Sequence, residues 1–174
     1  MEKSVKIEDS DRDFTTKRKN SYRPFRKTKH EKGAIETTKF VGMCSALSEH
    51  VYDCSGADQA EQYTKTTEKI AEYVGSEYVM GSNIKTAIET LSQSTLTMPN
   101  DPDDNASRTE IFMWQENVKL YMRKLDQLNE HTKKTYSLVW GQCSQAMGSR
   151  VEELADFPDI ATHFDPMRLL PQIK

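Results

Sequence analysis

The sequence predicts a small all-α domain, a bundle of five or six helices, that follows a disordered basic N-terminal arm. Two observations lead to this prediction. Apolar residues recur at spacings of three and four, which places them on one face of a helix. Several of these segments begin at residues that typically cap helices, and no segment shows the clean alternation of a half-buried strand.

Charge and apolar content divide the 174 residues into two parts. Residues 1–32 hold 11 Lys or Arg against 6 Asp or Glu and only 6 apolar residues, whereas residues 33–174 hold 13 against 21 and 56 apolar residues. So few apolar groups cannot offset the entropy lost when a backbone becomes ordered. The longer part can, since a chain of that size buries roughly two-thirds of its unfolded surface. We therefore predict a disordered arm over 1–32 and a helical domain over 33–174.

The first predicted helix spans residues 57–74. Ser55 and Asp58 have the spacing of a capping box, and Gly75 stands where a glycine commonly ends a helix. The apolar face between them comprises Ala60, Tyr63, Thr67, Ile70 and Val74.

The neighbouring segments are shorter. Residues 39–54 contain apolar and β-branched residues that suit either a short helix or a strand, because spacing cannot decide between them in so short a run. Ser82 is expected to cap a helix over 83–92. Residues 94–106 contain two prolines and several Asp and Asn residues, which predicts a loop.

The best-formed apolar stripe follows a second capping box, Ser107 with Glu110. Its members are Ile111, Trp114, Val118, Tyr121, Leu125 and Leu128. The stripe lasts less than three heptads, so it indicates a bundle helix, with an interruption expected at Asn129. Trp114 is expected to anchor the core, and the alternative is that it belongs to an exposed self-association face.

Two further helical segments complete the predicted domain. An apolar face with Gly141 inside it comprises Tyr136, Val139, Trp140, Cys143 and Met147. Val151 and Leu154 suggest one or two further turns. Asp165 followed by Pro166 is a typical helix start, and it opens a last helix.

Composition excludes several classes of protein. No apolar run approaches the roughly 20 residues that span a bilayer, and residues 1–14 lack the apolar segment of a secretory signal peptide. The cysteines Cys44, Cys54 and Cys143 are odd in number and widely spaced, which argues against a disulfide framework. We therefore expect a cytoplasmic protein with free thiols and no membrane partner.

The sequence contains no recognisable catalytic constellation. There is no glycine-rich phosphate loop, no GxSxG and no HExxH. A nucleophilic Cys143 would need a nearby base, but His131 lies about three turns away along the predicted helices. We interpret Cys143 as a buried structural thiol and expect a protein that is not an enzyme and has no small-molecule substrate.

The candidate metal motifs are incomplete. Cys44, His50 and Cys54 supply three ligands, whereas structural zinc sites normally have four. Residues 101–105 begin like a calcium loop, but Ala and Phe occupy the positions where such a loop carries Gly and Glu. We therefore expect neither a metal nor a cofactor.

The basic arm is the strongest functional signal in the sequence. Eight Lys or Arg residues with two aromatic residues among them suit phosphate neutralisation and base stacking on single-stranded nucleic acid. The candidate contact residues are Lys17, Arg18, Lys19, Tyr22, Arg23, Phe25, Arg26, Lys27, Lys29 and Lys32. The alternative is a solvated tail or a localisation signal.

The domain resembles the N-terminal Gag region of copia-type LTR retrotransposons over about residues 39–174. Phe40-Val41-Gly42 matches an early Phe-x-Gly segment of that family, Trp114 its helix with a tryptophan, and Leu138-Val139-Trp140 lies in a third characteristic region. The last helix lacks the tryptophan of the family pattern. The resemblance implies a capsid-like, all-α assembly module that packages element RNA, and hence a homo-oligomer with single-stranded RNA as a partner.

The resemblance is incomplete at the end of the chain. A second capsid half would be expected after Lys174, and no C-x2-C-x4-H-x4-C zinc knuckle occurs in these residues. The chain is accordingly interpreted as a fragment, a decayed copy or an excised derivative of a longer Gag. A helical adaptor that binds a cellular protein through an apolar helix face is the alternative function.

We expect the arm to bind single-stranded RNA weakly and without strong base preference. Four to six phosphate contacts would give a log–log salt dependence with a slope of about −3 to −4. Changing Tyr22 and Phe25 to Ala should weaken binding by roughly 1–3 kcal/mol per stacked base. Fluorescence anisotropy at two salt concentrations measures both effects. Equal binding by a protein that begins at Gly33 would rule out the arm as the RNA contact.

Overall fold

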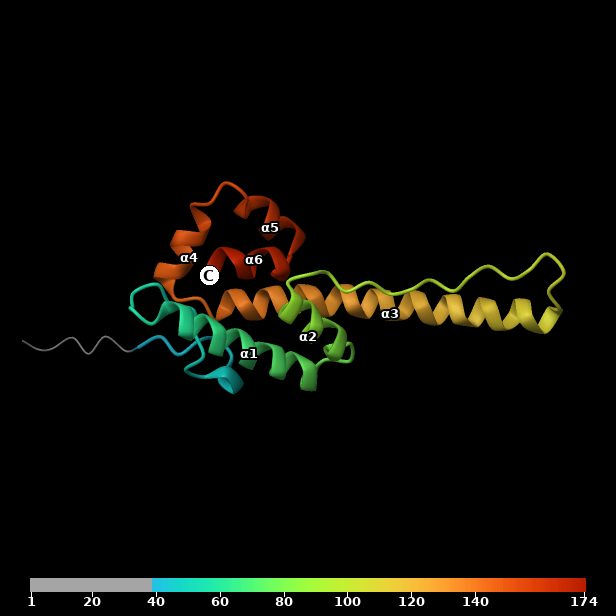
Figure 1. The fold of residues 1–174 in the computed structure, drawn as a ribbon, viewed down its shortest axis with the longest axis horizontal. Coiled ribbons are helices and arrows are strands. Elements are labelled where there is room, and N and C mark those ends of the chain that lie inside the picture. The colour runs from blue at the N-terminus through green and yellow to red at the C-terminus, as the bar shows by residue number, and fades with distance from the viewer. Residues whose placement is uncertain (1–38) are drawn as a thin grey trace, which may run out of the picture. The chain divides into compact units, whose positions relative to one another are not determined.

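Residues 39–174 form six α-helices and one short 3₁₀ turn, which confirms the all-α prediction (Figure 1). The computed structural model describes residues 39–174, which fall in one compact unit. In this part of the chain, the only β-type pairing is an isolated bridge between Tyr52 and Cys143. The predicted boundary between residues 32 and 33 lies outside the described residues. The elements are η1 (Ser45–Leu47), α1 (Gln59–Glu77), α2 (Gly81–Thr90), α3 (Arg108–Gly141), α4 (Gln145–Glu152), α5 (Phe157–His163) and α6 (Pro166–Ile173).

A close backbone approach joins α1 to α2. Only three residues separate the two helices, and a Cβ atom added to Gly81 would lie 2.4 Å from the carbonyl oxygen of Val74. Only glycine fits there, so α2 starts at Gly81, one residue before the predicted cap Ser82. Gly75, which was predicted to end α1, lies inside the helix because the backbone continues in helical conformation to Glu77.

The predicted capping box at the start of α1 is wrong. Asp58 is the N-cap residue, but its side chain accepts no cap hydrogen bond. The Ser55 hydroxyl instead donates to the Asp53 carboxylate. A helix does begin close to the predicted site, at Gln59. The Ser55 side chain, however, forms its hydrogen bond within the turn that precedes the helix.

α3 is a continuous helix of 34 residues, about 51 Å long at 1.5 Å per residue. Its capping box is confirmed: the Glu110 amide donates to Ser107 Oγ at 3.3 Å, and the Ser107 amide donates to Glu110 Oε2 at 2.7 Å. The interruption expected at Asn129 is wrong. The polar residues that follow are accommodated because the hydroxyls of Thr132 and Thr135 each donate to the backbone carbonyl four residues earlier, at 2.8 Å.

The apolar face predicted from Tyr136 to Met147 is divided between two helices. α3 ends at Gly141, and the chain turns before α4 because the Ser144 hydroxyl accepts a hydrogen bond from the Met147 amide at 3.3 Å. The predicted cap of the last helix is confirmed, since the Asp165 carboxylate accepts from the amides of Met167 and Arg168.

The core is built around α6, which packs against α2, α3, α4 and α5. Five of its apolar side chains are buried, together with residues from the other helices, and Figure 1 shows where α6 lies among them. The most deeply buried core members include Ile70, Val74, Ile84, Ile88, Val139, Met147, Val151, Ile160, Leu169, Leu170 and Ile173. This arrangement explains the strong amphipathic pattern of the last eight helical residues.

A buried glutamine fixes the irregular segment 40–53 to the end of α3. Gln142 Oε1 accepts a hydrogen bond from the Cys44 amide at 3.0 Å, and Nε2 donates to the carbonyl oxygens of Leu47 and His50 at 3.0 and 2.8 Å. Gly42 has a φ of +89°, and a Cβ atom there would lie 2.3 Å from Gln142 Nε2. The close fit therefore requires both the glycine and the glutamine.

We expect Gln142→Leu to lower the free energy of unfolding by about 3 kcal/mol, because the Cys44 amide and the His50 carbonyl lose their partner, at about 1–3 kcal/mol each. Leucine has a similar size, so the change tests hydrogen bonding more than packing. Chemical denaturation measures the effect. Gln145→Leu at an exposed position of α4 is the matched control, expected within about 0.5 kcal/mol of wild type. Similar stabilities for the two variants would contradict the assignment.

Candidate interaction surface

The ten residues predicted to contact nucleic acid, from Lys17 to Lys32, lie outside the described residues. The structure therefore leaves that interpretation as a prediction. The surface of residues 39–174 carries more acid than base, with 20 Asp or Glu against 13 Lys or Arg. Any affinity for a polyanion would have to come from the segment before this domain, because the net charge of the domain repels phosphates.

The surroundings of Cys143 fit a structural thiol and not a catalytic nucleophile. Burial raises the pKa of its thiol to about 12, so the thiol is protonated at neutral pH and a poor nucleophile. Its sulfur donates a weak hydrogen bond to the carbonyl oxygen of Val139 at 3.5 Å. His131 lies on α3, whereas Cys143 follows the end of that helix, and the His131 ring packs against Tyr78 with ring centroids 5.0 Å apart. All three cysteines are free thiols.

The candidate metal ligands do not converge. Among residues 39–174, no group of three or more His, Cys, Asp or Glu side chains is arranged to hold a metal ion. Asp53, which lies between His50 and Cys54, instead accepts a hydrogen bond from Ser144 Oγ at 2.6 Å. This bond and one from Ser55 lower the pKa of the Asp53 carboxyl. Asp53 therefore ties the irregular segment to the start of α4.

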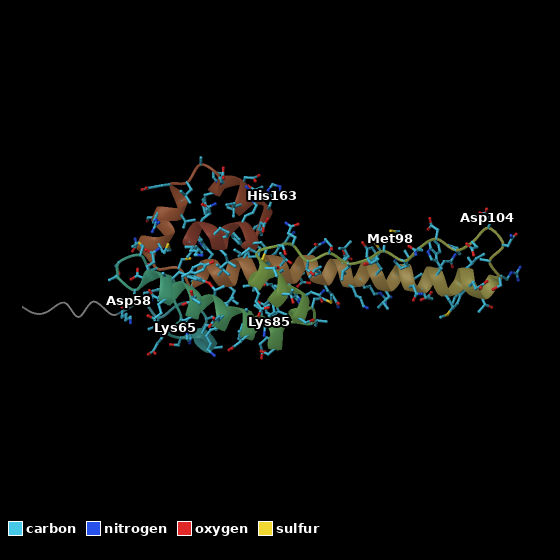
Figure 2. The ribbon with its side chains drawn as sticks, viewed as in Figure 1. Asp58, Lys65, Lys85, Met98, Asp104 and His163 are labelled. Carbon is cyan, nitrogen blue, oxygen red and sulfur yellow. The ribbon has the colours of Figure 1, made fainter. Side chains whose placement is uncertain are left out.

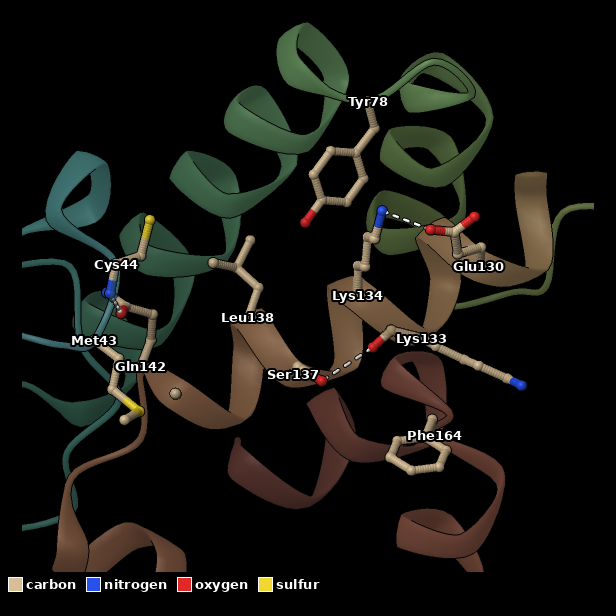
Figure 3. A pocket seen from close by; sticks show the side chains of 11 residues that line it. Met43, Cys44, Tyr78, Glu130, Lys133, Lys134, Ser137, Leu138, Gln142 and Phe164 are labelled. Carbon is tan, nitrogen blue, oxygen red and sulfur yellow. Dashed lines mark hydrogen bonds and ion pairs between the residues drawn. The ribbon is translucent and has the colours of Figure 1, made fainter.

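A shallow groove of about 590 Å³ runs along the C-terminal half of α3 (Figure 3). Met43, Leu138 and Phe164 give it an apolar lining. Of its charged groups, Lys134 pairs with Glu130 at 2.7 Å, whereas no ion pair within residues 39–174 involves Lys133. Ligand sites normally combine an enclosed apolar cavity with a few polar groups that converge on the ligand. This groove is open and, among the described residues, its one unpaired charge is a single lysine, so it gives little support for a small-molecule site.

The most unusual surface is the projecting half of α3, Arg108–Gln127. No side chain in this half is buried, and Leu128 is the first buried residue of the helix. Among residues 39–174, only the loop over 92–106 runs beside it, with Met98 and Asp104 on that loop (Figures 1 and 2). Large apolar side chains in this half are exposed, among them Phe112 at 59% and Met113 at 56%. Exposed apolar residues gathered on one element typically mark an interaction surface.

The loop covers part of the predicted stripe on this helix. Pro99 and Pro102 lie near Trp114, and Leu96 lies near Tyr121 and Leu125. Trp114 is consequently half-buried outside the core, and its Nε1 atom is shielded without a hydrogen-bond partner. The expectation that Trp114 anchors the core is wrong, because the helix extends past the body before it reaches this residue.

Trp140 occupies a different environment at the other end of α3. It packs against the edge of the core, with its ring centroid 5.1 Å from that of Phe157. Trp140 thus packs at the edge of the core, whereas Trp114 lies half-buried beside the loop on the projecting half of α3. The alternative that Trp114 belongs to a self-association face stays a prediction.

The sequence predicted a helix here but not its projection, because apolar spacing does not indicate whether a helix face meets the core, a loop or solvent. A signal was present nonetheless. Phe112, Met113, Leu120 and Met122 are apolar but lie off the predicted stripe, so a helix with one buried face leaves them exposed.

No protein-family model, curated protein or solved structure matches the chain. None of the helices formed by residues 39–174 has the length and apolar content needed to cross a membrane. The exposed apolar side chains on the projecting half of α3 are the main feature of the described residues that bears on function.

We expect Trp114→Ala to lower the free energy of unfolding by about 1–2 kcal/mol, less than the roughly 3–5 kcal/mol typical of a fully buried aromatic residue. The half-exposed indole contacts only the helix and the loop. Leu169→Ala in the centre of α6 is the matched comparison, with an expected loss of roughly 2–5 kcal/mol. Thermal or urea unfolding ranks the two variants, and an equal or larger loss for Trp114→Ala would restore it as a core anchor.

Proposed function

We propose that the chain is a non-enzymatic structural protein of the Gag type, which self-associates through its helical domain. The single observation that carries this proposal is the apolar surface on the projecting half of α3. Most helical stability in proteins comes from packing of an amphipathic face, and a loop packed on one side of this helix leaves much of its apolar area exposed. A protein partner that covers the helix would remove that area from water.

The resemblance to copia-type Gag over residues 39–174 favours a second copy of the chain as that partner. Assembly proteins require a surface that is exposed in the monomer and covered in the oligomer, and the projecting half of α3 meets the first requirement. We further propose that the basic residues between Lys17 and Lys32 contact single-stranded RNA. Opposite net charges on the two parts of the chain, +5 over residues 1–32 and −8 over residues 33–174, support that division of roles.

Self-association can be tested by size-exclusion chromatography with light scattering on the full chain. We expect the average mass to rise with protein concentration from the 20.0 kDa of one chain to at least twice that value. Nucleic acid should be removed first by nuclease and high salt, so that RNA does not bridge the copies. A mass that stays at one chain at every concentration would favour the adaptor alternative.

A further inference from the structure

Five residues of the projecting half of α3 form a strip with coiled-coil spacing. Ile111, Gln115, Val118, Met122 and Leu125 follow one another at intervals of four, three, four and three residues. This is the spacing of the positions that meet between paired helices. Ile111 is 39% and Met122 49% exposed, and Val118 and Leu125 are half-buried. We call these five residues the Ile111 strip.

From this strip we infer that two copies of the chain pair through α3 in antiparallel orientation. The inference rests on the proposed function and adds the surface and the geometry. In an antiparallel pair related by a two-fold axis, the residues of one helix meet those of the other in reverse order. The Ile111 strip satisfies this requirement about Val118, with Ile111 opposite Leu125 of the second copy and Gln115 opposite Met122. The spacings along the strip alternate between four and three residues in either direction along the helix. A strip of this kind can therefore pair with a reversed copy of itself.

The charges beside the strip select the antiparallel orientation. Arg108 and Asp126 are 18 residues apart, which is five full turns, so they lie on the same side of the helix. In the antiparallel pair Arg108 lies near Asp126 of the second copy, and the reverse contact occurs at the other end. A parallel two-fold pair would place Arg108 of one copy and Asp126 of the other at opposite ends of the contact, so these two ion pairs would not form.

The opposite side of the helix does not offer an equivalent surface. Met113 and Leu120 are exposed there at 56% and 48%, but they are only one heptad apart. Glu116, Asn117 and Lys124 occupy the adjoining positions on that side. On the projecting half of α3, only the Ile111 strip therefore has apolar residues at four of five successive seam positions.

The size of the contact predicts a weak dimer. A strip from Arg108 to Asp126 is about 27 Å long, and a helix with side chains is about 10–12 Å wide. One helix from each copy thus buries less than the roughly 800 Å² per partner of a standard stable interface. Dimerisation should accordingly be reversible and concentration-dependent, and tests need a covalent trap or a high protein concentration.

Disulfide trapping tests the orientation. Full-length Gln115→Cys and Met122→Cys, one of them carrying a mass tag, are mixed under mild oxidation. We expect about tenfold more mixed dimer than dimer from either variant alone, since equivalent positions lie about 10 Å apart along the axis, beyond the reach of a disulfide. Parallel pairing would instead trap each variant with itself, which would overturn the inference. Wild-type chain measures the background from the three native thiols.

An equilibrium comparison tests the surface without cross-linking. Met122→Lys places a charge in the strip, and Leu120→Lys places one at a similarly exposed site on the opposite side of the same helix. We expect Met122→Lys to weaken dimerisation at least about tenfold and Leu120→Lys less than about threefold. The reason is that dimerisation would remove the lysine at position 122 from water but leave the lysine at position 120 exposed. Circular dichroism verifies that both variants fold.

The outcomes separate the inference from the proposed function. Two results would overturn the antiparallel pairing but leave self-association in place. In the first, the chain associates with rising concentration but the two cysteine variants form no mixed disulfide dimer. In the second, the chain associates but Met122→Lys and Leu120→Lys weaken the association equally. A chain that is monomeric at all concentrations and is not trapped overturns both. Mixed trapping together with selective loss in Met122→Lys supports both.

Discussion

The hydrogen bonds of the buried Gln142 amide hold together segments that no regular element connects. Residues 40–53 contain only one short 3₁₀ turn, yet Leu47, Val51 and Tyr52 from this segment are buried. Backbone groups in such a segment need partners before its side chains can enter a core. Gln142 supplies them at the point where α3 ends, and the Tyr52 amide donates to the Gln142 carbonyl oxygen at 2.8 Å. α3 is thereby secured at its C-terminal end, which leaves its other half free to project.

Local signals predicted most of the helical architecture correctly. The capping box at Ser107 and the Asp165–Pro166 start specify helix ends through bonds within one turn, so they can be recognised from sequence alone. The errors arise where distant contacts decide. Gly75 stays helical while Gly81 makes the close approach, and spacing cannot distinguish two glycines whose roles depend on the packing of α2 against α1. Gln142 gave no signal, because its partners lie more than 90 residues away.

The interaction surface was partly visible in the sequence. The stripe from Ile111 to Leu128 was recognised, and an exposed self-association face was one of the two alternatives for its tryptophan. Apolar spacing, however, does not indicate whether a helix face meets the core, a loop or solvent. That distinction depends on how far α3 extends past the packed helices. The packing of α6 and the hydrogen bonds of Gln142 fix the C-terminal end of α3 and so determine which part of it projects. The nucleic-acid prediction concerns residues before this domain and stays a prediction.

The projecting half of α3 is also where the fold is held least strongly. Its amide hydrogens are secured by the helical hydrogen bonds and one capping box, without any buried side chain. Segments of this kind open locally at a small fraction of the global unfolding free energy, so their amides exchange with deuterium before those of the core. The residues that would meet a partner are thus the same ones that fray. Warming or mild denaturant would loosen this end of the helix, and with it any contact made there, while α6 and its neighbours remain folded.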